Sequence, residues 1–265
     1  MSASQQPLIQ FDRVTKAYAN ASAHALRDVS FEVQAGELVA LVGGSGSGKT
    51  TTLKCINRLI EPDSGEIYVQ GKAVRAQSGP ALRRHIGYVF QGVGLFPHLS
   101  VAENIGITPQ LLGWERARIA ARVDELLDLV ELPREFAARA PAALSGGQRQ
   151  RVGVARALAA EPQIVLMDEP FGALDPVTRD TLGRAYRKLH EQMGLTTVLV
   201  THDMLEALLL ADRILVMQSG ELLANDTPLA LLQSDNQPAV RELLDMPRKQ
   251  AERLQSLFPK DESNV

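Results

Sequence analysis

Cysteine is almost absent from this sequence, because Cys55 is the only one among 265 residues. A single thiol cannot form an intramolecular disulfide, and it cannot supply the ligands of a cysteine-based zinc site. Chains without disulfides are typical of a reducing compartment, so the composition favours the cytoplasm. We expect Cys55 to be a small, buried, apolar residue.

Long hydrophobic runs are missing as well. A membrane-spanning helix needs about 20 mostly apolar residues. The stretch 86–102 lacks Lys, Arg, Asp and Glu, but glycine, glutamine, proline and histidine interrupt it. Residues 1–13 have neither the basic start nor the apolar centre of a signal peptide. We therefore expect no secretion and no membrane span, so that any membrane role comes through a partner.

Basic charge is not in excess either: 28 Lys and Arg face 31 Asp and Glu, a net charge of -3. A nucleic-acid-binding domain is normally strongly basic, so we expect no nucleic-acid partner. Apolar residues make up 45% and charged residues 22%, the ordinary balance of a soluble globular protein. The length fits one compact unit with a modest insertion.

The order of sequence patterns predicts an α/β fold. Strands are expected at residues 8–14, 29–33, 37–42, 66–69, 164–167, 197–200 and 214–217, and a helix from Lys49 to about Ile60. Between Gln91 and Ala160 the pattern is helical, since apolar residues from Ile119 to Val130 fall on one helix face. The last three strands are apolar throughout, which is typical of a parallel sheet covered on both faces.

The strongest motif is GGSGSGKT at residues 43–50, a full match to G-x-x-x-x-G-K-[ST]. A predicted strand enters it and a predicted helix leaves it, so glycine-lined backbone N–H groups and a helix N-terminus can surround phosphate oxygens. Lys49 is expected to meet the β- and γ-phosphates, and the Thr50 hydroxyl to ligate Mg²⁺. The residues expected around the nucleotide here are Gly43, Gly44, Ser45, Gly46, Ser47, Gly48, Lys49, Thr50 and Thr51.

Two adjacent acids follow the apolar strand 164–167. Such residues lie at the carboxyl edge of a parallel sheet, where α/β proteins bind ligands. Because neighbouring residues of a strand face opposite ways, the two acids can have different roles. We expect Asp168 to reach the Mg²⁺ shell and Glu169 to deprotonate the attacking water. Alone, Asp-Glu-Pro is more often a solvated turn, but the phosphate loop upstream reverses that preference.

The segment 144–151, LSGGQRQR, begins another helix. Ser145 and Gln148 fit a capping box, which is a purely structural interpretation. Gly146 and Gly147 are poor helix formers. They do, however, leave backbone N–H groups accessible at the positive end of the helix, and such an end is an anion site.

In this order the motifs resemble those of the nucleotide-binding subunits of ABC transporters, over nearly the whole chain. On this resemblance, Tyr18 stacks on adenine, residues 43–50 are Walker A, Gln91 is the Q-loop, residues 144–148 are the signature, Asp168 and Glu169 end Walker B, residues 173–175 form the D-loop, and His202 is the switch histidine. Gly44 stands where the family often has proline.

The resemblance implies a P-loop NTPase core with a parallel sheet, an antiparallel β subdomain and an inserted helical subdomain. It divides the chain into residues 1–90 (first part of the core, with the β subdomain and Walker A), 91–160 (helical subdomain with Q-loop and signature), 161–238 (second part of the core, with Walker B, D-loop and switch histidine) and 239–265 (a short tail).

The resemblance also implies a head-to-tail dimer, in which ATP on one Walker A is closed by the other copy. The closing residues are Ser145, Gly146 and Gly147. The resemblance also counts Gln148 and the D-loop residue Asp175 among the nucleotide-binding residues. Glu169 is then the general base, His202 contacts the γ-phosphate, and Gln91 binds the metal or the water and carries motion to the helical subdomain, where a permease docks.

The phrase GLFPHLSVAENI at residues 94–105 resembles importer cassettes, and residues 91–95 and 109–114 are most similar to those of osmoprotectant systems for glycine betaine, choline or carnitine. This implies a peripheral subunit on the cytoplasmic face of the inner membrane, bound through permease subunits and served indirectly by an extracytoplasmic solute-binding protein. An importer for an amino acid, a polyamine or an anion stays open, as does a soluble ABC ATPase of translation or DNA repair.

Overall fold

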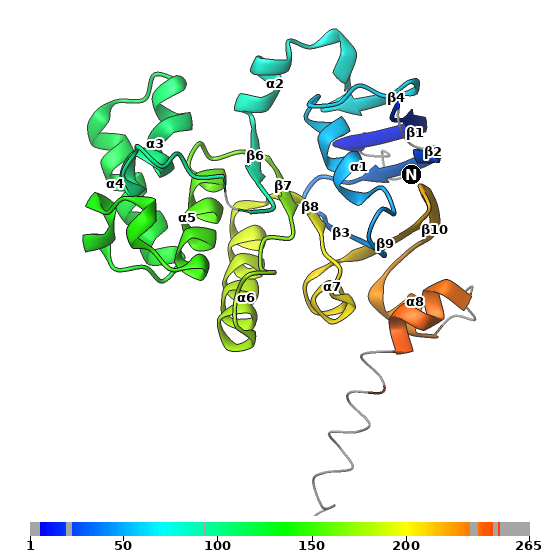
Figure 1. Ribbon diagram of the computed structural model, residues 1–265. Helices are drawn as coiled ribbons and strands as arrows, with labels where there is room; N and C mark the ends of the chain where they lie inside the picture. The colour runs from blue at the N-terminus through cyan, green and yellow to red at the C-terminus, as the bar shows by residue number, and fades with distance from the viewer. Residues whose placement is uncertain (1–5, 20–22, 93, 234–237, 246–248, 250–265) are drawn as a thin grey trace, which may run out of the picture.

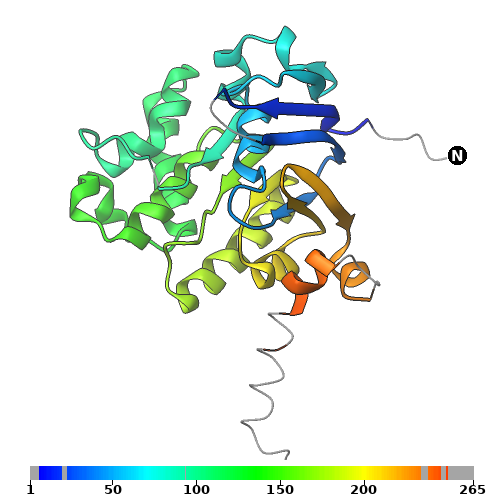
Figure 2. The same ribbon diagram turned by 45° about the vertical axis from the view of Figure 1, so that its right-hand side comes forward.

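The computed structural model describes residues 6–19, 23–92, 94–233, 238–245 and 249. Val93 and most of the predicted tail 239–265 lie outside these residues. Within them, the strands form two sheets, one of six strands and one of four. Figures 1 and 2 show the two sheets with α1 near both, and a separate group of helices beside the larger sheet.

The larger sheet has the strand order β10-β9-β3-β8-β7-β6. Its strands are β3 (Leu38–Val42), β6 (Ile86–Val89), β7 (Ile164–Asp168), β8 (Thr196–Val200), β9 (Arg213–Gln218) and β10 (Glu221–Asp226). Neighbours from β9 to β6 pair in parallel. Every residue of β3, β7 and β8 is buried, as expected for strands that are apolar throughout. The predicted parallel sheet is confirmed.

The edge strand β10 was missed by the sequence patterns. It pairs antiparallel with β9 after a tight turn in which Ser219 and Gly220 both have positive φ. Its residues are half-buried or exposed, so they show no continuous apolar run. An edge strand of this kind carries a weak sequence signal because only one neighbour and one face constrain it.

The smaller sheet is antiparallel, with order β2-β1-β4-β5. Its strands are β1 (Ile9–Ala17), β2 (His24–Val33), β4 (Ser64–Val69) and β5 (Lys72–Ala73). Phe11 and Phe31 stack across β1 and β2 with ring centroids 4.4 Å apart. They share a core with Leu53 and Ile56 of α1 (Lys49–Ile56), so this sheet covers the phosphate-loop helix. The prediction that the helix reaches Ile60 is wrong, because the α-helix ends at Ile56 and Arg58 turns the chain with φ 53°.

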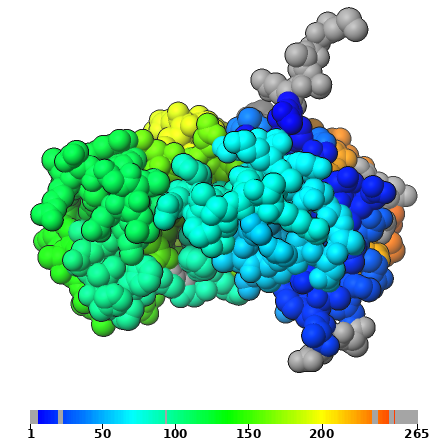
Figure 3. All heavy atoms as spheres, turned by 90° about the horizontal axis from the view of Figure 1, so that it is seen from above, coloured from blue at the N-terminus to red at the C-terminus, as the bar shows by residue number. Residues whose placement is uncertain are grey.

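Helices cover the face of the larger sheet that points away from the smaller sheet and α1. The long α6 (Pro176–Met193) packs there with α7 (Met204–Leu210), and a helical group stands beside them in Figure 1. That group comprises α3 (Val101–Leu111), α4 (Arg116–Leu129), η2 (Arg134–Ala138), η3 (Pro141–Ala143) and α5 (Gly146–Leu158). Further helices are η1 (Val74–Ala76), α2 (Gly79–Arg84) and α8 (Pro228–Gln233), and residues 238–245 are helical as well. The apolar face predicted between Ile119 and Val130 packs, as expected, into the hydrophobic core between the helical group and the larger sheet. Seen from above in Figure 3, the green helical group forms one lobe of the molecule and the cyan-to-blue N-terminal part forms most of the other.

Candidate nucleotide site

The candidate site lies where three neighbouring parallel strands end. β8 pairs with β3 on one side and with β7 on the other. The phosphate loop follows β3, the paired acids close β7, and His202 comes shortly after β8. The carboxyl ends of parallel strands share one edge of the sheet. Three motifs that are far apart in the sequence therefore meet at that edge.

The phosphate loop needs glycine at two positions for reasons of space and backbone conformation. Gly43 has φ 152°, and a Cβ there would lie 2.1 Å from the Met217 carbonyl oxygen. Gly48 has φ 106°, and its Cβ would lie 2.4 Å from the carbonyl oxygen of Ala25. A Cβ on Gly44 would meet nothing within 4 Å. Gly43 and Gly48 therefore fix the loop, while Gly44 does not constrain it.

The loop ends at the N-terminus of α1, which Gly48 caps without any side-chain hydrogen bond. The first N–H groups of a helix have no partner within the helix. Here a side-chain cap does not occupy them, so they remain available to an anion.

Lys49 folds back over the loop. Its Nζ donates to the carbonyl oxygens of Gly43 at 2.8 Å and Gly44 at 2.9 Å. The side chain is buried, which lowers the pKa of Lys49, while the carboxylates of Glu169 and Asp168 raise it. The ammonium group thus lies within the glycine-lined loop and within the electrostatic reach of both acids.

A hollow of about 510 Å³ adjoins the loop on the side of the smaller sheet. Its wall includes Tyr18, whose hydroxyl is 3.3 Å from the Thr51 Oγ1. His24 and Ala25 also line it and were missed by sequence reasoning. Only strand pairing could have identified them, because His24 lies opposite Ala17, the residue before Tyr18. The hollow has the size of a small-molecule site.

Asp168 contacts the start of α1. The Thr50 hydroxyl donates to its Oδ1 at 3.0 Å. Burial raises the pKa of Asp168 and so does the charge of Glu169, whereas the Thr50 hydrogen bond lowers it. A hydroxyl and a carboxylate side by side are the oxygen donors that Mg²⁺ prefers, so the two residues fit the predicted metal site.

Glu169 does not follow the strand alternation that the sequence predicts, because the strand stops before it. β7 ends at Asp168, and Glu169 adopts φ 48°, with its N–H held by the carbonyl oxygen of Val200 at 2.9 Å. Its Oε2 accepts a hydrogen bond from Gln91 Nε2 at 3.2 Å, and its Oε1 lies 3.3 Å from His202 Nδ1. A non-glycine residue in the left-handed region is uncommon and strained, and such residues concentrate at functional sites.

The signature segment forms the predicted capping box. The Ser145 Oγ accepts from the Gln148 N–H at 3.2 Å, and the Gln148 Oε1 accepts from the Ser145 N–H at 2.9 Å. Ser145 and Gly146 are exposed. α5 belongs to the core on the helical side of the sheet, whereas α1 belongs to the core on the other side. Within one chain, α5 and α1 therefore lie on opposite faces of the larger sheet.

Asp175 caps another helix. Its carboxylate accepts from the Thr178 N–H at 3.0 Å, and this bond lowers the pKa of Asp175. It thereby fixes the start of α6 directly after residues 173–175. The structure places Asp175 as a cap, and its predicted contact with a nucleotide stays a prediction.

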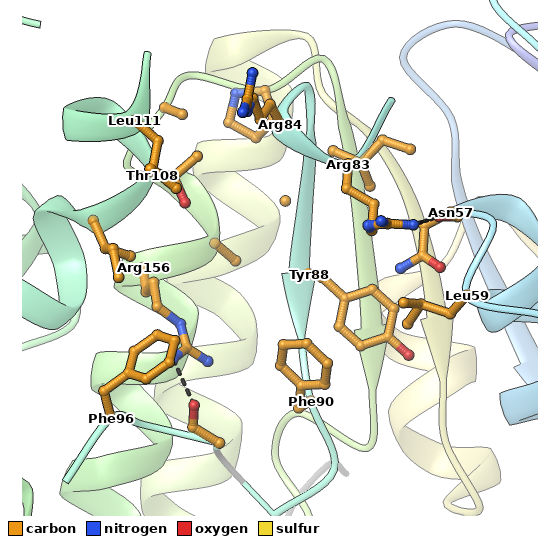
Figure 4. A pocket seen from close by; sticks show the side chains of 17 residues that line it. Asn57, Leu59, Arg83, Arg84, Tyr88, Phe90, Phe96, Thr108, Leu111 and Arg156 are labelled. Atoms are coloured by element: carbon orange, nitrogen blue, oxygen red, sulfur yellow. Dashed lines mark hydrogen bonds between the residues drawn. The ribbon is translucent and has the colours of Figure 1, made fainter. Parts of the chain in front are cut away.

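A second hollow, of about 480 Å³, lies between β6 and the helical group, away from the phosphate loop (Figure 4). Tyr88, Phe90, Phe96 and Leu111 give it an apolar wall. Arginines also line it: Arg83, Arg84 and Arg156. Phe90, Phe96 and Leu111 are exposed, so part of this apolar surface is accessible to a partner.

Residues 26–172 match the family model described as ABC transporter, more than half of the chain. Together with the phosphate loop, the paired acids and the capped signature, this match settles the class: the chain belongs to the ABC transporter family. The chain is 50% identical over 235 residues to the glycine betaine uptake system ATP-binding protein YehX of Escherichia coli, and covers 76% of that protein. It is 47% identical to the carnitine transport ATP-binding protein OpuCA of Listeria monocytogenes over 91% of this chain, but spans only 60% of the length of that relative.

The fold is likewise that of a solved cassette. A dimeric structure of MJ0796, a bacterial ABC transporter cassette, is 36% identical and superposes with a TM-score of 0.77 over 83% of this chain and 98% of that one. The same cassette was also solved as a dimer in a post-hydrolysis state with ADP and Pi. The predicted fold class and family are confirmed. Among the described residues, every helix is too short or too polar to cross a bilayer.

Proposed function

We propose that this chain binds and hydrolyses ATP and thereby powers the import of an osmoprotectant quaternary amine through a membrane permease. One observation carries the proposal: Glu169 lies beside Asp168 and the phosphate loop and contacts both Gln91 and His202. A carboxylate with two polar neighbours at the mouth of a phosphate loop is suited to hydrolysis of a terminal phosphate.

ATP would bind across the phosphate loop and the adjoining hollow, with its phosphates in the loop and its adenine in the hollow. Tyr18 would stack on the adenine at the wall of the hollow, and the loop N–H groups and Lys49 would hold the phosphates. Thr50 and Asp168 would hold Mg²⁺, which supplies charge neutralisation of the phosphate oxygens. The remaining residues proposed around the phosphates are Gly43, Gly44, Ser45, Gly46, Ser47, Gly48 and Thr51.

Glu169 would act as the general base. It takes a proton from the attacking water, while His202 contacts the γ-phosphate and holds water and base in line. Gln91 donates to Glu169 in the structure, and this contact supports a role in orienting the base or the water.

A second copy of the chain completes this proposal. The cassette MJ0796 was solved as a dimer, which supports a head-to-tail pair here. In that pair Ser145, Gly146, Gly147 and Gln148 of one copy would close the ATP bound to the other, with Asp175 at the border. The exposed N-terminus of α5 offers partly free N–H groups for this contact.

The arginine-lined hollow of Figure 4 is the surface that we assign to the permease. It lies between β6, which leads to Gln91, and the helical group. This docking would place the chain at the cytoplasmic face of the inner membrane, with an extracytoplasmic solute-binding protein on the far side of the permease.

The named relatives support an osmoprotectant as the solute. OpuCA of Listeria monocytogenes is a carnitine transport protein, YehX a glycine betaine uptake protein, and OpuBA of Bacillus subtilis a choline transport protein, 46% identical to this chain. Anion import is the second candidate, because the sulfate/thiosulfate import protein CysA of Synechococcus elongatus is 44% identical over 89% of the chain.

Replacement of Glu169 by Gln tests the ATPase proposal. Loss of a general base should lower kcat by about 10² to 10⁴-fold, while ATP binding persists. Lys49→Ala should instead weaken ATP binding itself, because an ammonium ligand of the phosphates is lost. Turnover by phosphate release and affinity by nucleotide fluorescence separate the two effects. Parental turnover in Glu169→Gln would refute the role of this residue.

The solute requires its own experiment. Vesicles containing the cognate permease and this chain should take up labelled glycine betaine, carnitine or choline when ATP is enclosed with the chain. Labelled sulfate is the comparison substrate. Uptake of sulfate but of none of the amines would overturn the osmoprotectant assignment and leave the ATPase proposal intact.

A further inference from the structure

His202 contacts Glu169 but is itself weakly enclosed, since its side chain is 64% exposed. A side chain so exposed is held mainly through its own backbone. The groups that fix the loop 201–203 therefore decide where the imidazole lies relative to the carboxylate.

The two neighbours of His202 are fixed by side-chain hydrogen bonds. The Thr201 hydroxyl donates to the Glu206 carboxylate and accepts from the Asp203 N–H at 3.0 Å. The Asp203 Oδ1 caps α7 by accepting from the N–H groups of Leu205 at 2.9 Å and Glu206 at 3.3 Å. These contacts fix the loop to α7, but they do not connect it to the loop that carries Glu169.

Arg179 on α6 makes that connection. Its Nη1 donates to the Asp203 Oδ2 at 3.2 Å, and its Nη2 donates to the Leu174 carbonyl oxygen at 3.3 Å. Leu174 lies in the segment that follows Glu169, and its side chain is buried. One planar guanidinium therefore links the segment after β7 to the loop after β8. A forked donor holds two acceptors at once, which an ammonium group cannot do in the same geometry.

The link is also close to the signature. A Cβ on Gly147 would lie 3.1 Å from Leu174 Cδ2, so Leu174 packs directly on this glycine. Arg179 and Asp203 are each about one-third exposed, so solvent screens their ion pair less than it screens a surface pair. One side chain, Arg179, thus contacts Leu174 of the D-loop, which packs on Gly147, and the loop 201–203 that carries His202.

We infer that Arg179 is a positioning residue for hydrolysis: by joining the Leu174 carbonyl to the Asp203 carboxylate, it holds His202 at Glu169. The inference rests on the proposed ATPase function. Arg179 touches neither the phosphate loop nor the hollow beside it, so it acts on the alignment of the reacting groups and not on ATP affinity.

The test compares Arg179→Met with Arg187→Met in the full chain. Arg187 lies two turns further along α6 and makes the same kind of double link, to the Leu210 carbonyl oxygen at 3.0 Å and Asp212 Oδ1 at 2.7 Å. Arg179→Met should lower kcat roughly tenfold to a hundredfold, because small displacements of reacting groups cost this much. Its KM for ATP should stay within about twofold. Arg187→Met should destabilise the fold at least as much, measured by urea unfolding, and leave kcat unchanged.

A double-mutant cycle identifies the residue through which Arg179 acts. In a His202→Ala background, Arg179→Met should have no further effect on kcat, because its target is already gone. Arg179→Lys should fall between parent and Arg179→Met, and it replaces Arg179→Met in the comparison if that variant does not fold.

Three results would overturn the inference: parental kcat in Arg179→Met (or in Arg179→Lys, if only that variant folds), equal loss in Arg187→Met, or full additivity with His202→Ala. An unmodified chain that fails to hydrolyse ATP, or a Glu169→Gln chain with parental turnover, would instead count against the proposed function.

Discussion

Glu169 shows how much one residue depends on its backbone. As the first residue after β7 it could have continued the strand, and its carboxylate would then have pointed to the face opposite Asp168. A positive φ at this position places it instead between Gln91 and His202, while the carbonyl oxygen of Val200 holds its N–H. The strain is therefore compensated by contacts from the neighbouring strand β8.

Glu206 makes stability depend on pH. Burial raises its pKa from the ordinary 4.5 to about 6, against the opposing effect of the Thr201 hydrogen bond. Between pH 4.5 and 6 the folded state keeps a proton on Glu206 that the unfolded chain has lost. The stability that depends on the protonated carboxyl is therefore fully present below pH 4.5 and is lost as the pH rises through 6. Glu206→Gln should therefore unfold like the parent at pH 4.5 and be up to about 2 kcal/mol more stable at pH 8.

Urea unfolding at the two pH values measures this difference. Glu32→Gln is the control, because Glu32 is exposed on the strand β2, away from any helix end, and should change stability little at either pH. A Glu206→Gln variant with the same stability offset at both pH values would contradict the predicted titration.

At the scale of elements, two helices of the helical group, α3 and α5, begin with the same capping box. Comparing them separates a structural role of the cap from a functional one. Ser100 and Glu103 form a capping box at α3, as Ser145 and Gln148 do at α5. Ser100→Ala and Ser145→Ala should each cost about 1 kcal/mol in the free energy of unfolding. Only Ser145→Ala should also lower ATP turnover, because only that hydroxyl is proposed to meet the nucleotide of a second copy.

Denaturant unfolding and phosphate release on both variants decide this prediction. Equal loss of turnover in Ser100→Ala would mean that the helical group merely needs to be stable. Unchanged turnover in Ser145→Ala would remove the hydroxyl from the proposed contact.

At the scale of the whole molecule, the two helices whose ends are proposed to bind phosphate, α1 and α5, lie on opposite faces of the larger sheet. On the proposed function, a second copy brings both kinds of helix end to one nucleotide. Glu169→Gln with MgATP should therefore double its mass in light scattering, because triphosphate charge bridges two helix ends and is not hydrolysed. Lys49→Ala under the same conditions should remain a monomer. High salt should weaken the pair.

A Glu169→Gln protein that stays monomeric at saturating MgATP, also beside its permease, would contradict the head-to-tail arrangement. A Lys49→Ala protein that dimerises equally well would show that the contact is independent of bound phosphate.

Much of this site could be predicted from the sequence because its signals are local. A strand, a glycine loop and a helix in direct succession define the phosphate loop, and the spacing of Ser145 and Gln148 defines a cap. The continuous apolar runs of β7 and β8 identify them as interior strands. The two wrong or missing predictions, the end of α1 and the strand β10, also have local causes. Arg58 turns the chain after α1 with a positive φ, which the sequence does not indicate because the residue is not glycine. β10 has too few buried residues to show a strand pattern.

The sequence by itself determined which chemical groups are present and on which kind of element each one lies, because periodicity, turn residues and capping act over a few positions. The tertiary structure alone decided which of them meet. Long-range pairing sets β8 between β3 and β7, and this order brings His202 to Glu169 and Asp168 to Thr50. Arg179 spans Leu174 and Asp203 for the same reason. No local spacing encodes the contact with Asp203, because it arises from the packing of α6 against a loop 24 residues further along the chain.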